Sequence, residues 1–392
     1  MNSTGRIVLS FLGTGNYQQT TYQWGSKQHT TPYFADAINQ FFVDHQLKVV
    51  MTREAQDEHG QLLSEVCEYE PLIIPSGQSQ SELWEMFDLI ETAIPEGCSL
   101  VVDVTHGFRS QPMIALAICV YLRTVKQVEV ERIVYGAYEA TDEHGLTPVF
   151  DLTPFLDLID WSMAAHQFQR HGNAIPMKDL LQAIHTQSHI DTDHYKAQGL
   201  STLGNRLSDF SRASAMIRPQ EILDNSQQVL NALEKARQDL ENLDETRPFS
   251  AILETVKQRV APFANQQGLF SRQGFDQQAN MIEFYLQTEQ YPQAITLARE
   301  AIVSKVCTQL QQDPLEKEGR KQAEDYLNTL AHGQRRMSQS GAEREVANLW
   351  LKVGEIRNDI DHAGMRTDPI PANTAVGNTK QYCEEVAAWL RR

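Results

Sequence analysis

Short apolar strands alternate with amphipathic helices through the first 150 residues, and this alternation restricts the possible folds more than any other feature. Residues 6–12 and 99–104 are apolar runs of strand length, and residues 112–125 repeat apolar side chains at helical spacing. Such alternation predicts a doubly wound, mostly parallel sheet. Further strands are expected at 47–52, 72–74, 128–135 and, at an edge of the sheet, 146–150, and further helices at 32–43 and 81–93.

The pattern changes after the last of these strands. Strand signals fade, glycine and proline become sparse, and apolar residues recur at helical spacing, as in 292–310 and 342–363. The sequence therefore predicts an α/β, Rossmann-like domain at residues 1–152, followed by an all-α domain at residues 153–392.

Charge and cysteine content narrow the functional classes. A net charge of −17 argues against broad binding to nucleic acid, because phosphates would be repelled, and stable DNA binding is not expected. The five cysteines are scattered and odd in number, which is typical of reduced core thiols in a cytoplasmic protein and indicates no zinc site. No apolar run has the length of a membrane span, and the N-terminus leads into a strand instead of a signal peptide.

Two polar loops follow apolar strands, at the edge where parallel α/β sheets bind ligands. The first, residues 13–16, reads Gly-Thr-Gly-Asn; a dinucleotide fingerprint would need a third glycine where Gln18 stands and an acidic residue nearer than Glu54, so NAD and FAD are rejected. The second, residues 103–110, reads Asp-Val-Thr-His-Gly-Phe-Arg-Ser and precedes the most apolar helix. Its hydroxyl, imidazole and guanidinium groups suit phosphates and base edges.

The helix at 342–363 carries a third candidate site, Arg357, Asn358 and His362. Asn358 and His362 share a helix face, whereas Arg357 and His362 lie about 140° apart. Histidine titrates near neutrality and can move a proton from a ribose 2′-hydroxyl or onto a leaving oxygen, and arginine can hold a phosphate that gains charge. The three residues therefore indicate RNA cleavage without a metal, with an ordinary surface helix as the alternative.

These motifs resemble two known domain families in a fixed order. Residues 13–17 (Gly-Thr-Gly-Asn-Tyr) and 103–110 resemble the CARF domain of CRISPR-associated proteins, and residues 357–362 (Arg-Asn-Asp-Ile-Asp-His) resemble the signature of HEPN ribonucleases. About residues 185–275 we see no resemblance, and we expect an insertion there.

The resemblance implies a cytoplasmic endoribonuclease of type III CRISPR antiviral defence, activated allosterically by cyclic oligoadenylate of four or six adenylates. It also implies a homodimer with the ring across its two-fold axis, single-stranded RNA as substrate, cyclic-phosphate and 5′-hydroxyl products, and no metal or other cofactor. Arg357 would hold the scissile phosphate, His362 would transfer protons, and Asn358 would orient one of them. The residues implied in ligand binding are Gly13, Thr14, Gly15, Asn16, Thr105, His106, Gly107, Phe108 and Arg109.

Other interpretations stay open at this point. The protein could be a nucleotide sensor or scaffold without nuclease activity, it could cleave its own ligand through Thr105 and His106, or it could be a small-molecule enzyme. Residues 17–31, with Tyr22 and Trp24, are expected as a long loop that either covers adenines or adds Trp24 to the core. Further candidates for guiding RNA, with solvated surface as the alternative, are Arg335, Arg336 and Arg344.

Overall fold

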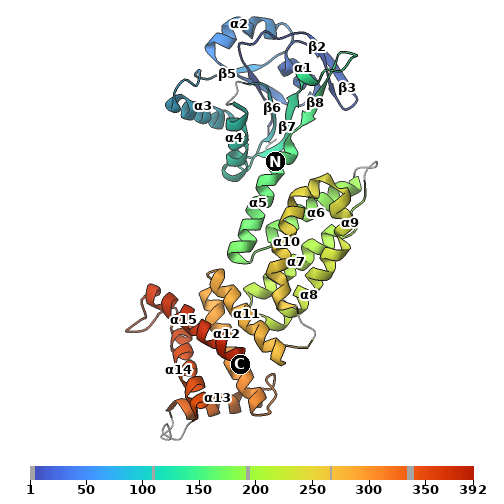
Figure 1. The fold of residues 1–392 in the computed structure, drawn as a ribbon. Coiled ribbons are helices and arrows are strands. Elements are labelled where there is room, and N and C mark those ends of the chain that lie inside the picture. The colour runs from blue at the N-terminus through green and yellow to red at the C-terminus, as the bar shows by residue number, and fades with distance from the viewer. Residues whose placement is uncertain (1–4, 108–110, 191–194, 265–266, 333–339) are drawn as a thin grey trace. The chain divides into compact units, whose positions relative to one another are not determined.

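The structure is a computed structural model that describes residues 5–107, 111–190, 195–264, 267–332 and 340–392 (Figure 1). Its two compact units are Met1–Ile159 and Asp160–Arg392. The strands are β1 (Arg6–Leu12), β2 (Thr20–Trp24), β3 (Lys27–Thr31), β4 (Gln46–Met51), β5 (Glu70–Ile73), β6 (Ser99–His106), β7 (Glu129–Gly136) and β8 (Leu146–Asp151). The helices of the sheet unit are α1 (Phe34–Phe41), α2 (Arg53–Ser64), α3 (Gln80–Ala93) and α4 (Gln111–Val125).

The eight strands form one sheet in the order β3-β2-β8-β7-β6-β1-β4-β5. β1 runs parallel to β4 and β6, β4 to β5, and β6 to β7, so the predicted doubly wound, mostly parallel sheet is confirmed. The predicted edge position of β8 is wrong, because β2 pairs with its far side.

The expected long loop at 17–31 is also wrong, because it contains a hairpin. β2 and β3 pair antiparallel from Thr20 opposite Thr31 to Trp24 opposite Lys27, and Gly25 takes a positive φ of 57° in the turn. Tyr22 is 1% exposed, so it belongs to the core and cannot cover a ligand. The strand sequences TTYQW and KQHTT contain few aliphatic residues, which explains why the apolar pattern did not reveal them.

Alternate side chains of the central strands build two cores on opposite faces of the sheet. Ile7, Leu9 and Phe11 of β1 pack in a cluster with residues of α3 and α4, whereas Val8 and Leu12 pack in a second cluster with residues of α1 and α2. Helices therefore pack on both faces of the sheet, as in other open α/β sheets, which bind ligands beyond the carboxyl ends of their strands.

The second unit is helical in its described part and shares one apolar core. The helix α5 (Thr153–His171) is followed by α6 (Ile175–Ile190), α7 (Leu200–Ala215), α8 (Pro219–Lys235), α9 (Arg237–Asn242), α10 (Arg247–Val260), the short η3 (Ala261–Phe263), α11 (Arg272–Gln287), α12 (Tyr291–Gln309), α13 (Lys317–His332), α14 (Gly341–Asp361) and α15 (Ala372–Leu390). An α/β region followed by an all-helical region is confirmed (Figure 1).

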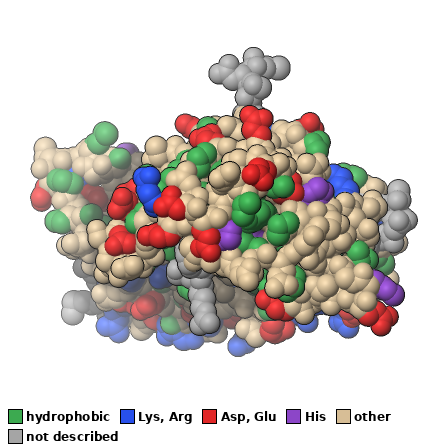
Figure 2. All heavy atoms as spheres, turned by 90° about the horizontal axis from the view of Figure 1, so that it is seen from above, with side chains coloured by type: hydrophobic (Ala, Val, Ile, Leu, Met, Phe, Trp, Pro, Cys, Tyr) green, Lys and Arg blue, Asp and Glu red, His purple; other side chains and the backbone are tan. Residues whose placement is uncertain are grey.

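The surface agrees with the net charge of −17, since acidic side chains are scattered among neutral ones over the face that Figure 2 shows. All five cysteines are buried and unpaired. Among the described residues, no helix combines the length and the apolar character that a bilayer crossing requires.

Candidate functional sites

The two polar loops meet at the point where the strand order reverses. β1 lies between β4, which follows it in the chain, and β6, which belongs to the other half of the sheet. Leu12, the last residue of β1, is in register with His106, the last residue of β6. Open α/β sheets bind ligands at this switch point, beyond the carboxyl ends of the strands, so the fold places both predicted loops where a ligand is expected.

The first loop is anchored at its start, and its next three residues are exposed. Gly13 is buried, and its N–H donates to the Tyr17 hydroxyl at 3.0 Å, whereas Thr14, Gly15 and Asn16 are exposed. A Cβ on Gly15 would lie 3.1 Å from Cε1 of Tyr17, which is a close contact, so glycine suits this position. The side chain of Tyr17 therefore contacts this loop and restrains its conformation.

The second predicted loop begins later than expected, because β6 extends to His106, and the last two residues of this strand, Thr105 and His106, each make a hydrogen bond within the fold. The Oγ1 of Thr105 accepts from the Gly136 N–H at 2.8 Å, and the Nε2 of His106 accepts from the Phe34 N–H at 3.3 Å. His106 thus caps the N-terminus of α1 in its neutral form. Burial, together with the nearby His59, lowers the pKa of His106 to about 4, although a hydrogen bond to the Pro32 backbone acts in the opposite direction.

A neutral, engaged His106 cannot supply positive charge to a phosphate at pH 7, and its low basicity makes it a poor proton acceptor there. The arrangement therefore argues against ligand cleavage by Thr105 and His106. Gly107 is partly buried beside them. Phe108 and Arg109, the other two predicted ligand residues, lie outside the described residues.

Three residues at this edge of the sheet were not predicted as part of the site. Tyr17 lies 4.1 Å from His106 and 5.0 Å from His59 between ring centroids, and the hydroxyl of Tyr33 lies 3.2 Å from Nδ1 of His59. Tyr17 follows the first loop directly, so its position was a usable signal. His59 is on α2, an unpredicted helix of mainly polar residues, and nothing in the sequence linked it to the loops.

A buried carboxyl group joins the two strands below the loops. Asp103 on β6 accepts from the Ser10 hydroxyl of β1 at 2.5 Å and from the Thr105 N–H at 2.7 Å. Burial raises the pKa of Asp103 to about 6, although these hydrogen bonds act in the opposite direction.

Asp103 and His106 should make opposite contributions to the pH dependence of stability. The pKa of His106 is lowered to about 4, so its stabilisation is present above its unfolded pKa of about 6.5 and is lost as the pH falls toward 4. The pKa of Asp103 is raised to about 6, so its stabilisation is present below about 3.8 and is lost as the pH rises through 6. Each change amounts to roughly 3 kcal/mol, and the two oppose each other between pH 4 and 6.

We therefore expect Asp103→Asn to lose stability on acidification from pH 6.5 to 4, relative to the native protein, and His106→Gln to gain it. Denaturant unfolding at several pH values, followed by circular dichroism, measures both differences. Parallel pH profiles for the native protein and both variants would contradict this assignment.

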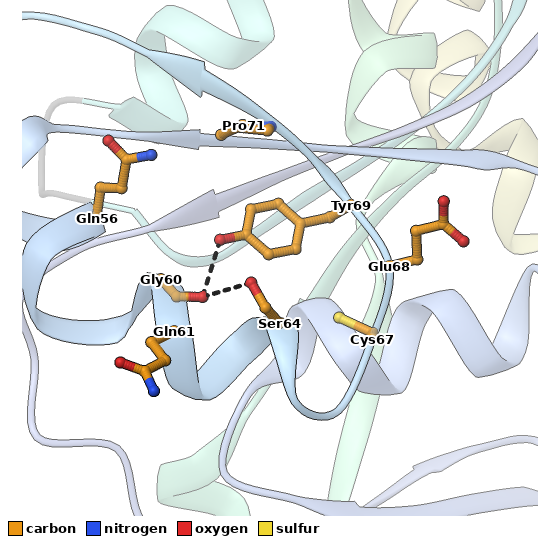
Figure 3. Close-up of a pocket in the computed structure, with 8 residues that line it drawn as sticks. All are labelled: Gln56, Gly60, Gln61, Ser64, Cys67, Glu68, Tyr69 and Pro71. Atoms are coloured by element: carbon orange, nitrogen blue, oxygen red, sulfur yellow. Dashed lines mark hydrogen bonds between the residues drawn. The ribbon is translucent and has the colours of Figure 1, made fainter.

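A separate hollow of about 500 Å³ lies between α2 and the start of β5 (Figure 3). The hydroxyls of Ser64 and Tyr69 both donate to the carbonyl of Gly60, at 2.8 and 3.1 Å. These bonds tie the chain after α2 back onto the helix. The residues that line the hollow include none of the predicted site residues.

The third candidate site lies at the C-terminal end of α14. A capping box of Ser340 and Glu343 begins this helix, and His362 is its C-terminal cap residue, just before Ala363 and Gly364 turn into positive φ. α14 therefore ends within two residues of the predicted end at residue 363. His362 is exposed, and no other described residue makes a hydrogen bond to its ring.

Arg357 and Asn358 precede His362 on the last turn of α14. The Nε of Arg357 lies 2.7 Å from Oδ2 of Asp361, and its Nη1 donates to Oδ1 of Asn358 at 3.4 Å. Asn358 also accepts the His362 N–H at its backbone carbonyl. The structure therefore brings all three predicted residues to one helix end, with an acidic neighbour on the guanidinium.

Asp359 fixes the chain just after this helix end and was not predicted. Its carboxylate is 5% exposed, accepts from the Ile370 N–H at 3.3 Å and lies 3.6 Å from Nη1 of Arg366. Its carbonyl accepts from Gly364. Asp359 thus holds residues 364–370 against α14 and restrains the backbone that carries His362.

The other arginines suggested for RNA do not join this site. Arg344 is exposed in the first turn of α14, 18 positions before His362, which is about 27 Å along a helix. Arg335 and Arg336 lie outside the described residues.

The comparisons with known proteins point to CRISPR systems. Residues 157–264 match the family profile described as CRISPR-associated protein MJ1674, second domain. This stretch is therefore similar to a domain of a CRISPR-associated protein. It covers most of α5 and continues to η3, and therefore includes most of the stretch that was expected to be an insertion. The predicted similarity to CRISPR-associated proteins is confirmed over this stretch.

A curated relative supports the same stretch. CRISPR-associated protein MJ1674 of Methanocaldococcus jannaschii is 34% identical over 113 residues, which are 28% of this chain and 18% of the relative. The chain thus matches less than a fifth of that relative's length.

Among solved structures, Enterococcus italicus Csm6 bound to cyclic hexa-2′-fluoro-hexa-dAMP aligns with 99% of this chain and 94% of its own. The TM-score is 0.44 and the sequence identity 10%.

Proposed function

We propose that this CRISPR-associated protein is an endoribonuclease that cleaves single-stranded RNA without a metal ion. The observation that carries the proposal is the meeting of Arg357, Asn358 and His362 at the exposed end of α14. Exposure lets an RNA strand reach the imidazole, and the buried Asp359 restrains the backbone beside it.

In this mechanism the imidazole of His362 takes the proton of a ribose 2′-hydroxyl, whose oxygen then attacks the adjacent phosphorus. The bond to the 5′-oxygen breaks, and that oxygen takes the proton that His362 has accepted, which restores the neutral imidazole and gives a 2′,3′-cyclic phosphate and a 5′-hydroxyl. Arg357 stabilises the charge that grows on the phosphate. The phosphate must compete with Asp361 for this guanidinium, and Asn358 orients Arg357.

We further propose that the α/β part, residues 1–152, binds cyclic oligoadenylate and controls a ribonuclease part at 153–392. The support is the meeting of the loops at 13–16 and 105–107 at the switch point. A homodimer in the cytoplasm would present both loops twice to a two-fold symmetric ring, and binding would shift the dimer population toward an active nuclease.

The test is cleavage of a fluorescent single-stranded RNA in EDTA, with no activator, with cyclic tetra-adenylate or with cyclic hexa-adenylate. We expect cleavage with one ring only, giving cyclic-phosphate ends. Tight ring binding without cleavage would indicate a sensor or scaffold and would overturn the nuclease. Cleavage that no ring alters would overturn the activation.

A further inference from the structure

Two histidines of α6 lie beside each other in the domain shared with the CRISPR family. His185 and His189 are one helical turn apart, and their ring centroids are separated by 4.8 Å with 54° between the planes. The candidate sites described above use neither ring.

A backbone carbonyl fixes the ring of His189. Its Nε2 lies 2.8 Å from the Ala197 carbonyl oxygen, which can only accept, so Nε2 carries the proton and Nδ1 keeps its lone pair. Ser188 ties the same segment to α6, since its hydroxyl accepts from the Ala197 N–H at 3.1 Å. Histidines that bind metals commonly donate their second N–H to a carbonyl in this way.

The neighbouring ring has an unused nitrogen. Nδ1 of His185 is buried and makes no hydrogen bond. An imidazole binds a metal ion through a nitrogen that carries no proton, and this nitrogen has no competing hydrogen-bond partner among the described residues.

We propose that His185 and His189 bind one divalent transition-metal ion, and we assign Zn²⁺, which imidazole ligands suit. A ring centroid lies about 3.2 Å from a metal bound at about 2.0–2.1 Å by one of its nitrogens. A centroid separation of 4.8 Å then corresponds to a ligand–metal–ligand angle of about 97°, between the octahedral and tetrahedral values. Paired histidines at this helical spacing are a known zinc-binding arrangement.

Within the described part of the chain, no third His, Cys, Asp or Glu completes a metal-binding group, so the proposal rests on the two imidazoles alone. The ion would bridge the last turns of α6 and, through Ala197, reinforce the connection to α7. This role is structural and does not depend on the proposed nuclease.

The test uses the full chain after dialysis against EDTA and removal of the chelator. Zn²⁺ is titrated against a chromophoric competitor for the native protein, His185→Gln, His189→Gln and His166→Gln. His166 is the matched control, because it is an exposed histidine of the same unit on α5 and no second imidazole ring lies beside it among the described residues.

We expect both variants of the pair to lose one zinc equivalent or to bind it at least about 10-fold more weakly, while His166→Gln binds as the native protein does. Saturating Zn²⁺ should also raise the Tm of the native protein and of His166→Gln by a few degrees, and not that of the pair variants. Unchanged stoichiometry and affinity in correctly folded His185→Gln and His189→Gln, checked by circular dichroism, would overturn the proposal.

Discussion

His362→Ala is expected to lower the rate of RNA cleavage by about 10²- to 10⁴-fold, the usual contribution of a proton-transferring side chain. Stability should barely change, because the ring is exposed and makes no hydrogen bond to another described residue. The loss should therefore appear in single-turnover cleavage rates of the activated protein, with unchanged thermal unfolding and unchanged affinity for the activating ring.

His332→Ala is the matched control, since His332 is also an exposed histidine at the end of a helix in the same unit. It should cleave at the native rate. If His362→Ala cleaves as fast as His332→Ala, the end of α14 is not the active site, and the proposed nuclease must act elsewhere or not at all.

Arg357→Ala offers a further check on this assignment. It removes a group that stabilises charge on the phosphate and leaves the imidazole of His362 in place, so single-turnover cleavage should slow without being abolished.

The sheet could be predicted from the sequence wherever its strands are apolar. β1 and β6 are buried on both faces, so their aliphatic runs were clear, and the loops that follow them could be assigned to the ligand edge. The β2–β3 hairpin could not be seen, because its threonines and glutamines pair through the backbone without an apolar pattern. Missing it also placed β8 wrongly at an edge.

The residues of the candidate sites likewise fall into those that the sequence could predict and those that it could not. Arg357, Asn358 and His362 are close in sequence on one helix, so their proximity followed from helical geometry. His59 reaches the ligand edge from another helix, and Asp359 acts through a loop that folds back from residues 364–370. Such contacts depend on tertiary packing, which a local pattern does not encode.

The clearest example of a contact that depends on tertiary packing lies in a polar stretch of the helical unit. Residues 225–244 are rich in Gln, Asn and Glu, which alone favours a solvated helix, but α9 within them buries Asp239, which is 1% exposed. Its carboxylate accepts from the backbone N–H groups of Gln198, Gly199 and Leu200, at 2.6 to 3.1 Å. α7 begins at Leu200, and its own cap residue, Gly199, has no side chain to do this.

Asp239→Ala should therefore destabilise the helical unit by about 3–5 kcal/mol, because it leaves several N–H groups at a buried helix start without an acceptor. It also removes a negative charge from the positive end of the helix dipole and the partner of the Tyr195 hydroxyl. Chemical denaturation of the full chain measures the loss.

Two variants decide the cause of that loss. Asp224→Ala removes an exposed carboxylate of α8 and should change stability by less than about 0.5 kcal/mol. Asp239→Asn keeps one acceptor oxygen, so we expect a smaller loss than with alanine. Equal losses for asparagine and alanine would assign the effect to the negative charge, whereas an Asp239→Ala protein as stable as Asp224→Ala would show that α7 does not depend on this cap.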